Sequence, residues 1–258
     1  MKAVNIEIAT NLSCPRRCPG CNRSCDVYPE RVEEMSLDQI DRFIDQMRRA
    51  KAEGRIRVKK VKLAGGESLV HSQFRAIYDH LVAALDEGLY EGLKINVSDH
   101  PDYPVPKDIP RHPKVRWLHS PPRKKKHLPY GIAPVDLGMG NKGANGCRVP
   151  WTCGLGLDYR GFAPCTAAIM IMRSFGMEHL YKQELPDDAW GLDEVCQYCI
   201  FSADKAWKDE WFRTHKGLSK YEMTASWKKA LAAYEEKEGI KRRVFAIRNA
   251  PKEPTNDR

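Results

Sequence analysis

The sequence predicts an α/β protein built on a parallel sheet, either an open sheet or part of a βα barrel. Strand-like and helix-like stretches alternate through the first hundred residues, which is the pattern of βαβ units. Cysteines follow the first predicted strand, and a glycine pair with a glutamate follows the second. In such folds the loops after the carboxyl ends of the strands carry the chemistry.

The first two predicted elements are a short strand and an amphipathic helix. Residues 3–9 alternate apolar and polar side chains and run directly into a cysteine-rich loop. A helix is predicted over about 36–53, because Ser36 and Gln39 match a capping box and apolar residues recur at helical spacing behind them. Gly54 provides a stop for that helix.

The following elements complete a β–α–β–α–β order. Strands are indicated around residues 58–63 and 93–97, with a helix over 72–87 between them. A proline-rich stretch then leaves little room for a long helix before a strand-like segment at 115–119. Residues 120–146 are rich in proline and glycine and indicate a linker or lid.

One more helix is predicted near the end of the chain. It covers residues 219–238, with Ser219 and Glu222 as a second capping box and Gly239 at its end.

Composition limits the class of protein. The chain has 258 residues, of which 42% are hydrophobic and 30% charged, and no apolar run approaches the ~20 residues that span a bilayer. The amino-terminal residues contain no signal-peptide pattern, so we expect a cytoplasmic protein without membrane contact. Nine cysteines in a reducing compartment more often bind metal than form disulfides.

The net charge of +9 has two interpretations. It is either an ordinary solvated basic surface or a sign of an anionic partner, such as a nucleotide substrate, a nucleic acid or an acidic electron-donor protein. The basic run at 123–126 follows two prolines and has no interleaved aromatic residues. It therefore indicates an exposed loop before it indicates a nucleic-acid site.

Cys14, Cys18 and Cys21 form the first chemical motif, with a C-x₃-C-x₂-C spacing. Three thiolates on a short loop can bind three irons of a cubane and leave the fourth iron for an outside ligand. In this spacing and position the sequence resembles the radical S-adenosylmethionine superfamily. The resemblance implies a [4Fe–4S] cluster on these cysteines, with S-adenosylmethionine on the fourth iron, and a truncated βα barrel as the fold.

Two features of this loop depart from the simplest match. Gly20 stands before the third cysteine, where the family usually has an aromatic residue. Cys25 lies four residues beyond Cys21 and could close the site as a fourth ligand, which would give a structural zinc or a closed cluster.

Gly65, Gly66 and Glu67 resemble the family's Gly-Gly-Glu segment after the second strand. The resemblance implies that they bind the methionine amino group: glycines let the backbone approach the ligand and a carboxylate offsets the ammonium. Asn96 and Ser98, after the third strand, are candidates for the ribose hydroxyls or the methionine carboxylate, with loop capping as an equal explanation.

A second group of cysteines lies in the carboxyl-terminal half. A predicted hairpin around 158–161 has cysteines near both ends, and a C-x₂-C pair follows. This resembles the twitch domain, the short form of the SPASM extension, which implies an auxiliary [4Fe–4S] cluster. The expected ligands are Cys147, Cys165, Cys196 and Cys199, with Cys153 as an alternative to Cys147. Zinc is the rival metal, because Cys₄ zinc sites use similar spacings.

The resemblance implies the following organisation and activity. A radical core would cover residues 1–126, a linker or lid 127–146, a twitch-like domain 147–205, and a helical segment with a tail 206–258. One electron from a flavodoxin or ferredoxin would cleave S-adenosylmethionine, and the resulting 5′-deoxyadenosyl radical would abstract hydrogen from a substrate.

We expect a small polar substrate, a sugar or nucleotide, and a net oxidation or rearrangement. A peptide- or protein-modifying enzyme of the same superfamily is the first alternative. The second is a non-catalytic zinc or iron–sulfur module that contacts nucleic acid. That module requires Cys25 as a metal ligand and leaves Glu67 without a ligand role.

Overall fold

The structure is a computed structural model of the chain. It describes residues 2–16, 18, 21–25, 33–120, 131–139, 147–214 and 223–240. Gly20, the basic run at 123–126, Ser219, Glu222 and most of the predicted linker lie outside the described residues.

A six-stranded sheet forms the centre of the protein, with the strand order β4-β3-β2-β1-β5-β6. Neighbouring strands are parallel except for β5 and β6, which form an antiparallel hairpin. The predicted α/β class with a parallel sheet is therefore confirmed. The strands are β1 (Lys2–Ala9), β2 (Ile56–Ala64), β3 (Tyr90–Val97), β4 (Val115–His119), β5 (Leu155–Asp158) and β6 (Gly161–Ala163).

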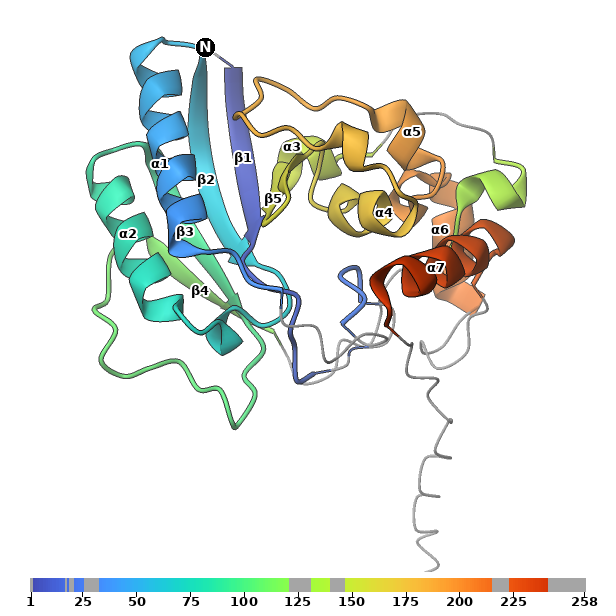
Figure 1. Cartoon of the computed structure of the whole chain (residues 1–258), viewed down its shortest axis with the longest axis horizontal. Coiled ribbons are helices and arrows are strands. Elements are labelled where there is room, and N and C mark those ends of the chain that lie inside the picture. Colours follow the sequence, from blue (N-terminus) through green and yellow to red (C-terminus); the bar gives the residue numbers. More distant parts are fainter. Residues whose placement is uncertain are drawn as a thin grey trace, which may run out of the picture.

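Seven α-helices are described along the chain. The two amino-terminal helices cover one face of the sheet, while the other five lie beyond β1, towards the carboxyl-terminal half (Figure 1). The α-helices are α1 (Leu37–Ala52), α2 (Phe74–Asp86), α3 (Val149–Thr152), α4 (Ala168–Ser174), α5 (Leu192–Cys196), α6 (Lys205–Thr214) and α7 (Ala225–Glu238). Short 3₁₀ helices are η1 (Ser68–Val70), η2 (Pro134–Leu137), η3 (Glu178–Leu180) and η4 (Ile200–Ser202).

The local signals at the start of α1 are confirmed. The Ser36 hydroxyl accepts a hydrogen bond from the backbone of Gln39, and the Gln39 side chain accepts one from the backbone of Ser36. This capping box satisfies two backbone donors that a helix start otherwise leaves open. Gly54 follows the end of the helix with a φ of 64°, a conformation that favours glycine.

Alternate residues of the parallel strands form the main core. The side chains facing α1 and α2 are apolar and fully buried: Ile6, Ile8, Val61, Leu63, Leu93 and Ile95. Because side chains alternate along a strand, the residues between them face the opposite side of the sheet. On that opposite face lie Glu7, Lys62, Lys94 and Asn96, so one side of the sheet is apolar and the other carries polar groups.

The carboxyl-terminal half joins this sheet directly. Strand β5 pairs in parallel with β1, from Ile6 opposite Leu155 to Ile8 opposite Leu157. The sheet thus contains strands from both the predicted core and the predicted twitch-like domain, and the domain limits stay a prediction. A second core surrounds the buried helix α4 and includes Trp227 of α7.

The start of the last helix differs from the prediction. Helix α7 begins at Ala225, after Thr224 at the N-cap, and not at Ser219. Thr224 and the preceding residue are not helical, so the second capping box does not start this helix. The predicted end is correct, because Gly239 closes the helix with a φ of 63°. No helix in the described ranges is long and apolar enough to cross a bilayer.

Candidate functional site

The cysteine loop and the glycine segment meet at the carboxyl ends of β1 and β2. Cys14, Cys18 and Cys21 line the same cavity as Gly65, Gly66 and Glu67, with a volume of about 350 Å³. Adjacent parallel strands place their following loops at one edge of the sheet. The expected neighbourhood of the two motifs is therefore present in the fold.

Backbone hydrogen bonds join the two loops. The amide of Gly66 donates to the carbonyl of Asn11 at 3.0 Å, and the amide of Glu67 donates to the carbonyl of Ser13 at 2.7 Å. A Cβ on Gly66 would lie 1.8 Å from that Ser13 oxygen, closer than any real side chain comes. Glycine is thus required here because the backbone leading to Cys14 packs directly against it.

Glu67 presents a buried carboxylate beside the thiols. It is 1% exposed, and it accepts hydrogen bonds from the backbone amides of Ser98, at 2.6 Å, and Leu69, at 3.2 Å. Two neutral amides fix the carboxylate without neutralising its charge. The group can therefore attract a positively charged atom of a ligand in the cavity.

Asn96 and Ser98 line the same cavity. The Ser98 hydroxyl is buried and has no hydrogen-bond partner among the described residues. Buried polar atoms are normally paired, so a polar group of a ligand would supply the hydrogen bond that this hydroxyl lacks. The structure thus brings all five predicted cofactor-binding residues to the cavity that the three cysteines line.

Cys25 points elsewhere. Its Sγ is buried and donates to the carbonyl of Leu12 at 3.3 Å, and it does not line the cavity of Cys14, Cys18 and Cys21. The thiol that could have closed the first site is therefore turned into the protein interior.

The thiol of Cys14 is in an unfavourable place for negative charge. Burial, together with the charges of Cys21, Glu67 and Cys18, raises the pKa of this thiol to about 12. Metal binding removes such protons because the ion supplies the missing positive charge. The iron ions of the expected cluster would supply that positive charge.

The expected auxiliary cysteines also form one group. Cys165 follows β6, Cys196 is the last residue of α5, and Cys199 lies just before η4. Burial raises the pKa of Cys165 and Cys196 to about 12, and that of Cys199 well above its usual value. The charge of Cys147 acts on all three of these thiols. The four side chains thus lie within electrostatic reach of one another.

Cys153 has a different position. It lines the main cavity and a smaller neighbouring one, and its charge acts on Cys147 but is not among those acting on Cys165, Cys196 or Cys199. Cys147 is therefore favoured over Cys153 as the fourth member of the group, because its charge reaches the other three thiols.

Both thiol groups leave the choice of metal as the sequence left it. In the described part of the chain, no three His, Cys, Asp or Glu side chains are placed to hold a single metal ion. Iron–sulfur clusters, with zinc as the rival, stay a prediction for both groups.

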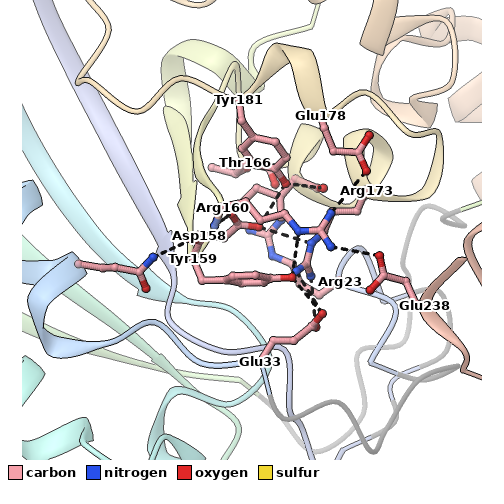
Figure 2. Close-up of polar contacts among 12 residues, drawn as sticks. Arg23, Glu33, Asp158, Tyr159, Arg160, Thr166, Arg173, Glu178, Tyr181 and Glu238 are labelled. Atoms are coloured by element: carbon pink, nitrogen blue, oxygen red, sulfur yellow. Dashed lines mark hydrogen bonds and ion pairs between the residues drawn. The ribbon is translucent and has the colours of Figure 1, made fainter.

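Arg23 links the two cysteine regions and was not predicted. Its side chain is 3% exposed and pairs with Glu7 of β1 at 2.6 Å. It also donates to the backbone carbonyl of Thr166, next to Cys165, and Figure 2 shows Arg23 and Thr166 within one polar network. Arg23 thereby connects the first cysteine loop, the sheet and the segment of the second group.

A second buried cation, Arg173 of α4, holds the hairpin in place. Its side chain is fully buried, lies 3.7 Å from Asp158 and 3.4 Å from Glu33, and stacks over the Tyr159 ring at 4.7 Å (Figure 2). Burial raises the pKa of Asp158, and the charge of Arg173 opposes that rise. Helix α4, the β5–β6 hairpin and the segment after the cysteine loop are joined at this point.

Comparison with known proteins adds one distant similarity. No protein-family model and no curated protein matches this chain. The solved structures similar to it include the crystal structure of BtrN in complex with AdoMet and 2-DOIA. The two chains are 14% identical, the match covers 85% of this chain and 90% of that chain, and the TM-score is 0.36.

Proposed function

We propose that this protein is a radical S-adenosylmethionine enzyme. The observation that carries the proposal is the shared cavity of Cys14, Cys18 and Cys21 with Gly66 and the buried carboxylate of Glu67. Cys25 points away from this cavity, so the cysteine loop itself contributes three thiols, which suits a four-iron cluster with one iron open to an outside ligand.

Each group at the cavity has a definite task in this proposal. Cys14, Cys18 and Cys21 hold a [4Fe–4S] cluster. Glu67 attracts the methionine ammonium. Gly66 has no side chain, so the ligand can come close to its backbone. Asn96 and the unpartnered hydroxyl of Ser98 bind the ribose or the methionine carboxylate.

When bound, the cofactors would supply the difficult chemistry: with one electron from a flavodoxin or ferredoxin, S-adenosylmethionine would be cleaved reductively and a hydrogen atom taken from the substrate. The protein's part is to hold the reacting groups together and keep water out. The second thiol group, Cys147, Cys165, Cys196 and Cys199, holds an auxiliary cluster. Such a cluster would either accept an electron from the substrate in a net oxidation or bind the substrate directly.

The substrate is a small polar metabolite, a sugar or a nucleotide. The walls of the cavity carry polar and charged side chains such as Glu7 and Lys62, which suit a polar molecule beside the cofactor. Two features speak against a non-catalytic metal module. Such a module needs Cys25 as a ligand, and it gives no reason for a buried carboxylate beside the thiols.

The test is anaerobic reconstitution with iron and sulfide, then addition of dithionite and S-adenosylmethionine, with 5′-deoxyadenosine measured by liquid chromatography. We expect 5′-deoxyadenosine from the wild-type protein and from Cys25→Ser, and none from Cys18→Ser. Cys25→Ser is the matched control, because it removes a thiol of the same loop that lies outside the cavity. Zinc with no iron–sulfur absorbance, or loss of the cluster in Cys25→Ser but not in Cys18→Ser, would contradict the proposal.

A further inference from the structure

A row of charged side chains crosses the polar face of the sheet. The register places Glu7 of β1 opposite Lys62 of β2, Lys62 opposite Lys94 of β3, and Lys94 opposite Arg116 of β4. Lys60 lies on the same face, two residues before Lys62. This cationic row thus contains four cations, Lys60, Lys62, Lys94 and Arg116, beside one carboxylate.

The cationic row is electrostatically unbalanced. Lys62 pairs with Glu7 at 2.6 Å, but Glu7 is shared with Arg23. Within the ranges that the structure describes, Lys60, Lys94 and Arg116 form no ion pair with an acidic side chain. Like charges directly opposite on neighbouring strands are destabilising, so this arrangement of cations costs the fold some stability.

The charged side chains of the cationic row also repel one another. Burial lowers the pKa of Lys94 from its usual value, and the charges of Lys60, Arg116 and Lys62 lower it further. An anion placed among these side chains would relieve that repulsion and gain charge-assisted hydrogen bonds.

A hollow of suitable size lies at the cationic row. It has a volume of about 190 Å³, and Lys60, Lys62 and Lys94 line it. It shares Lys62 and Cys153 with the main cavity. A group bound in the hollow would therefore lie beside a molecule in the main cavity, where hydrogen abstraction is proposed.

We propose that the substrate carries a phosphate group and that Lys60, Lys62 and Lys94 bind it in this hollow. This inference rests on the proposed function and narrows its substrate to a phosphorylated sugar or a nucleotide. Glu7 is the positioning residue, because its bond to Lys62 holds that ammonium between the hollow and the main cavity. Three lysines suit a phosphate on a flexible molecule, because each ammonium is a point charge on a flexible side chain and can adjust its position.

The test is isothermal titration calorimetry on the reconstituted protein under anaerobic conditions, with inorganic pyrophosphate as the probe. We expect binding to the wild type, about tenfold or greater weakening in Lys94→Met, and near-wild-type binding in Lys94→Arg, which keeps the charge. The matched control is Lys107→Met, which removes a lysine from the exposed loop between β3 and β4 and should change affinity less than twofold.

Two results would overturn the inference. One is wild-type protein that does not bind pyrophosphate, or that loses binding equally in Lys94→Met and Lys107→Met. The other is malonate binding more tightly than pyrophosphate, which would assign the hollow to a carboxylate. Calorimetry needs no cleavage of S-adenosylmethionine, so a failed phosphate site and a failed radical reaction are told apart by measuring 5′-deoxyadenosine in the same samples.

Discussion

Replacing Gly66 with alanine tests the contact between the cysteine loop and the glycine segment. The new Cβ would stand 1.8 Å from the Ser13 carbonyl oxygen, and real Cβ atoms essentially never come within 3.0 Å. One of the two backbones must therefore move by at least the difference, 1.2 Å. Gly66 does not have a positive φ, so the cost is purely steric and falls on the residue before Cys14.

A displacement of this size is large for a catalytic site. Metal–ligand distances tolerate only about 0.2 Å, and a misplacement of about 1 Å can lower a rate 10²-fold. We therefore expect Gly66→Ala to form 5′-deoxyadenosine at least about 100-fold more slowly than the wild type. The assay is chromatography of the product, with iron content measured on the same sample.

The control for this variant is Gly54→Ala. Its Cβ would meet nothing within 4 Å, but its φ is +64°, so it should cost about 1–2 kcal/mol of stability and leave cleavage unchanged. If Gly66→Ala cleaved S-adenosylmethionine at the wild-type rate, the two loops could not be packed as described.

Three further predictions concern the second thiol group and stability. Cys165→Ser should lower the iron content from about eight to about four per chain, whereas Cys153→Ser should keep about eight, as metal analysis after reconstitution can show. Arg173→Met removes a fully buried cation and should lower the free energy of unfolding by about 3–5 kcal/mol in denaturant titrations. Asp136 accepts hydrogen bonds from Ser226 in the first turn of α7. Burial alone would raise its pKa, but these bonds lower it. Its stabilisation is therefore present above about pH 4 and lost as pH falls through the lowered pKa. Asp136→Asn should thus be less stable than the wild type at pH 7, by up to about 1 kcal/mol, with the gap closing in acid.

Much of the amino-terminal half is predictable because its signals are local. The capping box of Ser36 and Gln39 depends on residues three apart, and the apolar faces of α1 and α2 depend on helical spacing alone. The meeting of Cys14 with Gly66 also follows from the sequence. Consecutive parallel strands end at one edge, so their loops must be neighbours.

Long-range pairing explains what the sequence does not reveal. The partner of β5 could have been either edge of the sheet, and only the folded chain places it beside β1. The inward turn of Cys25 depends on the Leu12 carbonyl, which no spacing rule predicts. The start of α7 was misplaced because Ser219 matches a capping box, while Thr224 is the residue at the cap.

The make-up of the cationic row depends on one irregularity in the pairing of β1 with β2. A bulge between Val4 and Asn5 shifts the pairing of β1 with β2 by one residue. Without it, Glu7 would lie opposite Val61 and not Lys62. A shift of one residue moves side chains to the other face of a sheet, so this charged row cannot be read from alternation alone.

The most direct test of the central claim is whether S-adenosylmethionine binds the iron that has no cysteine. Electron paramagnetic resonance and double resonance of the dithionite-reduced protein, with ¹⁵N at the amino nitrogen of S-adenosylmethionine, report that bond. We predict a changed cluster spectrum and a ¹⁵N coupling in the wild type and in Cys25→Ser, with the coupling lost in Glu67→Ala. A reduced cluster whose spectrum is unaffected by S-adenosylmethionine would contradict the account, because S-adenosylmethionine would then not be bound to the cluster.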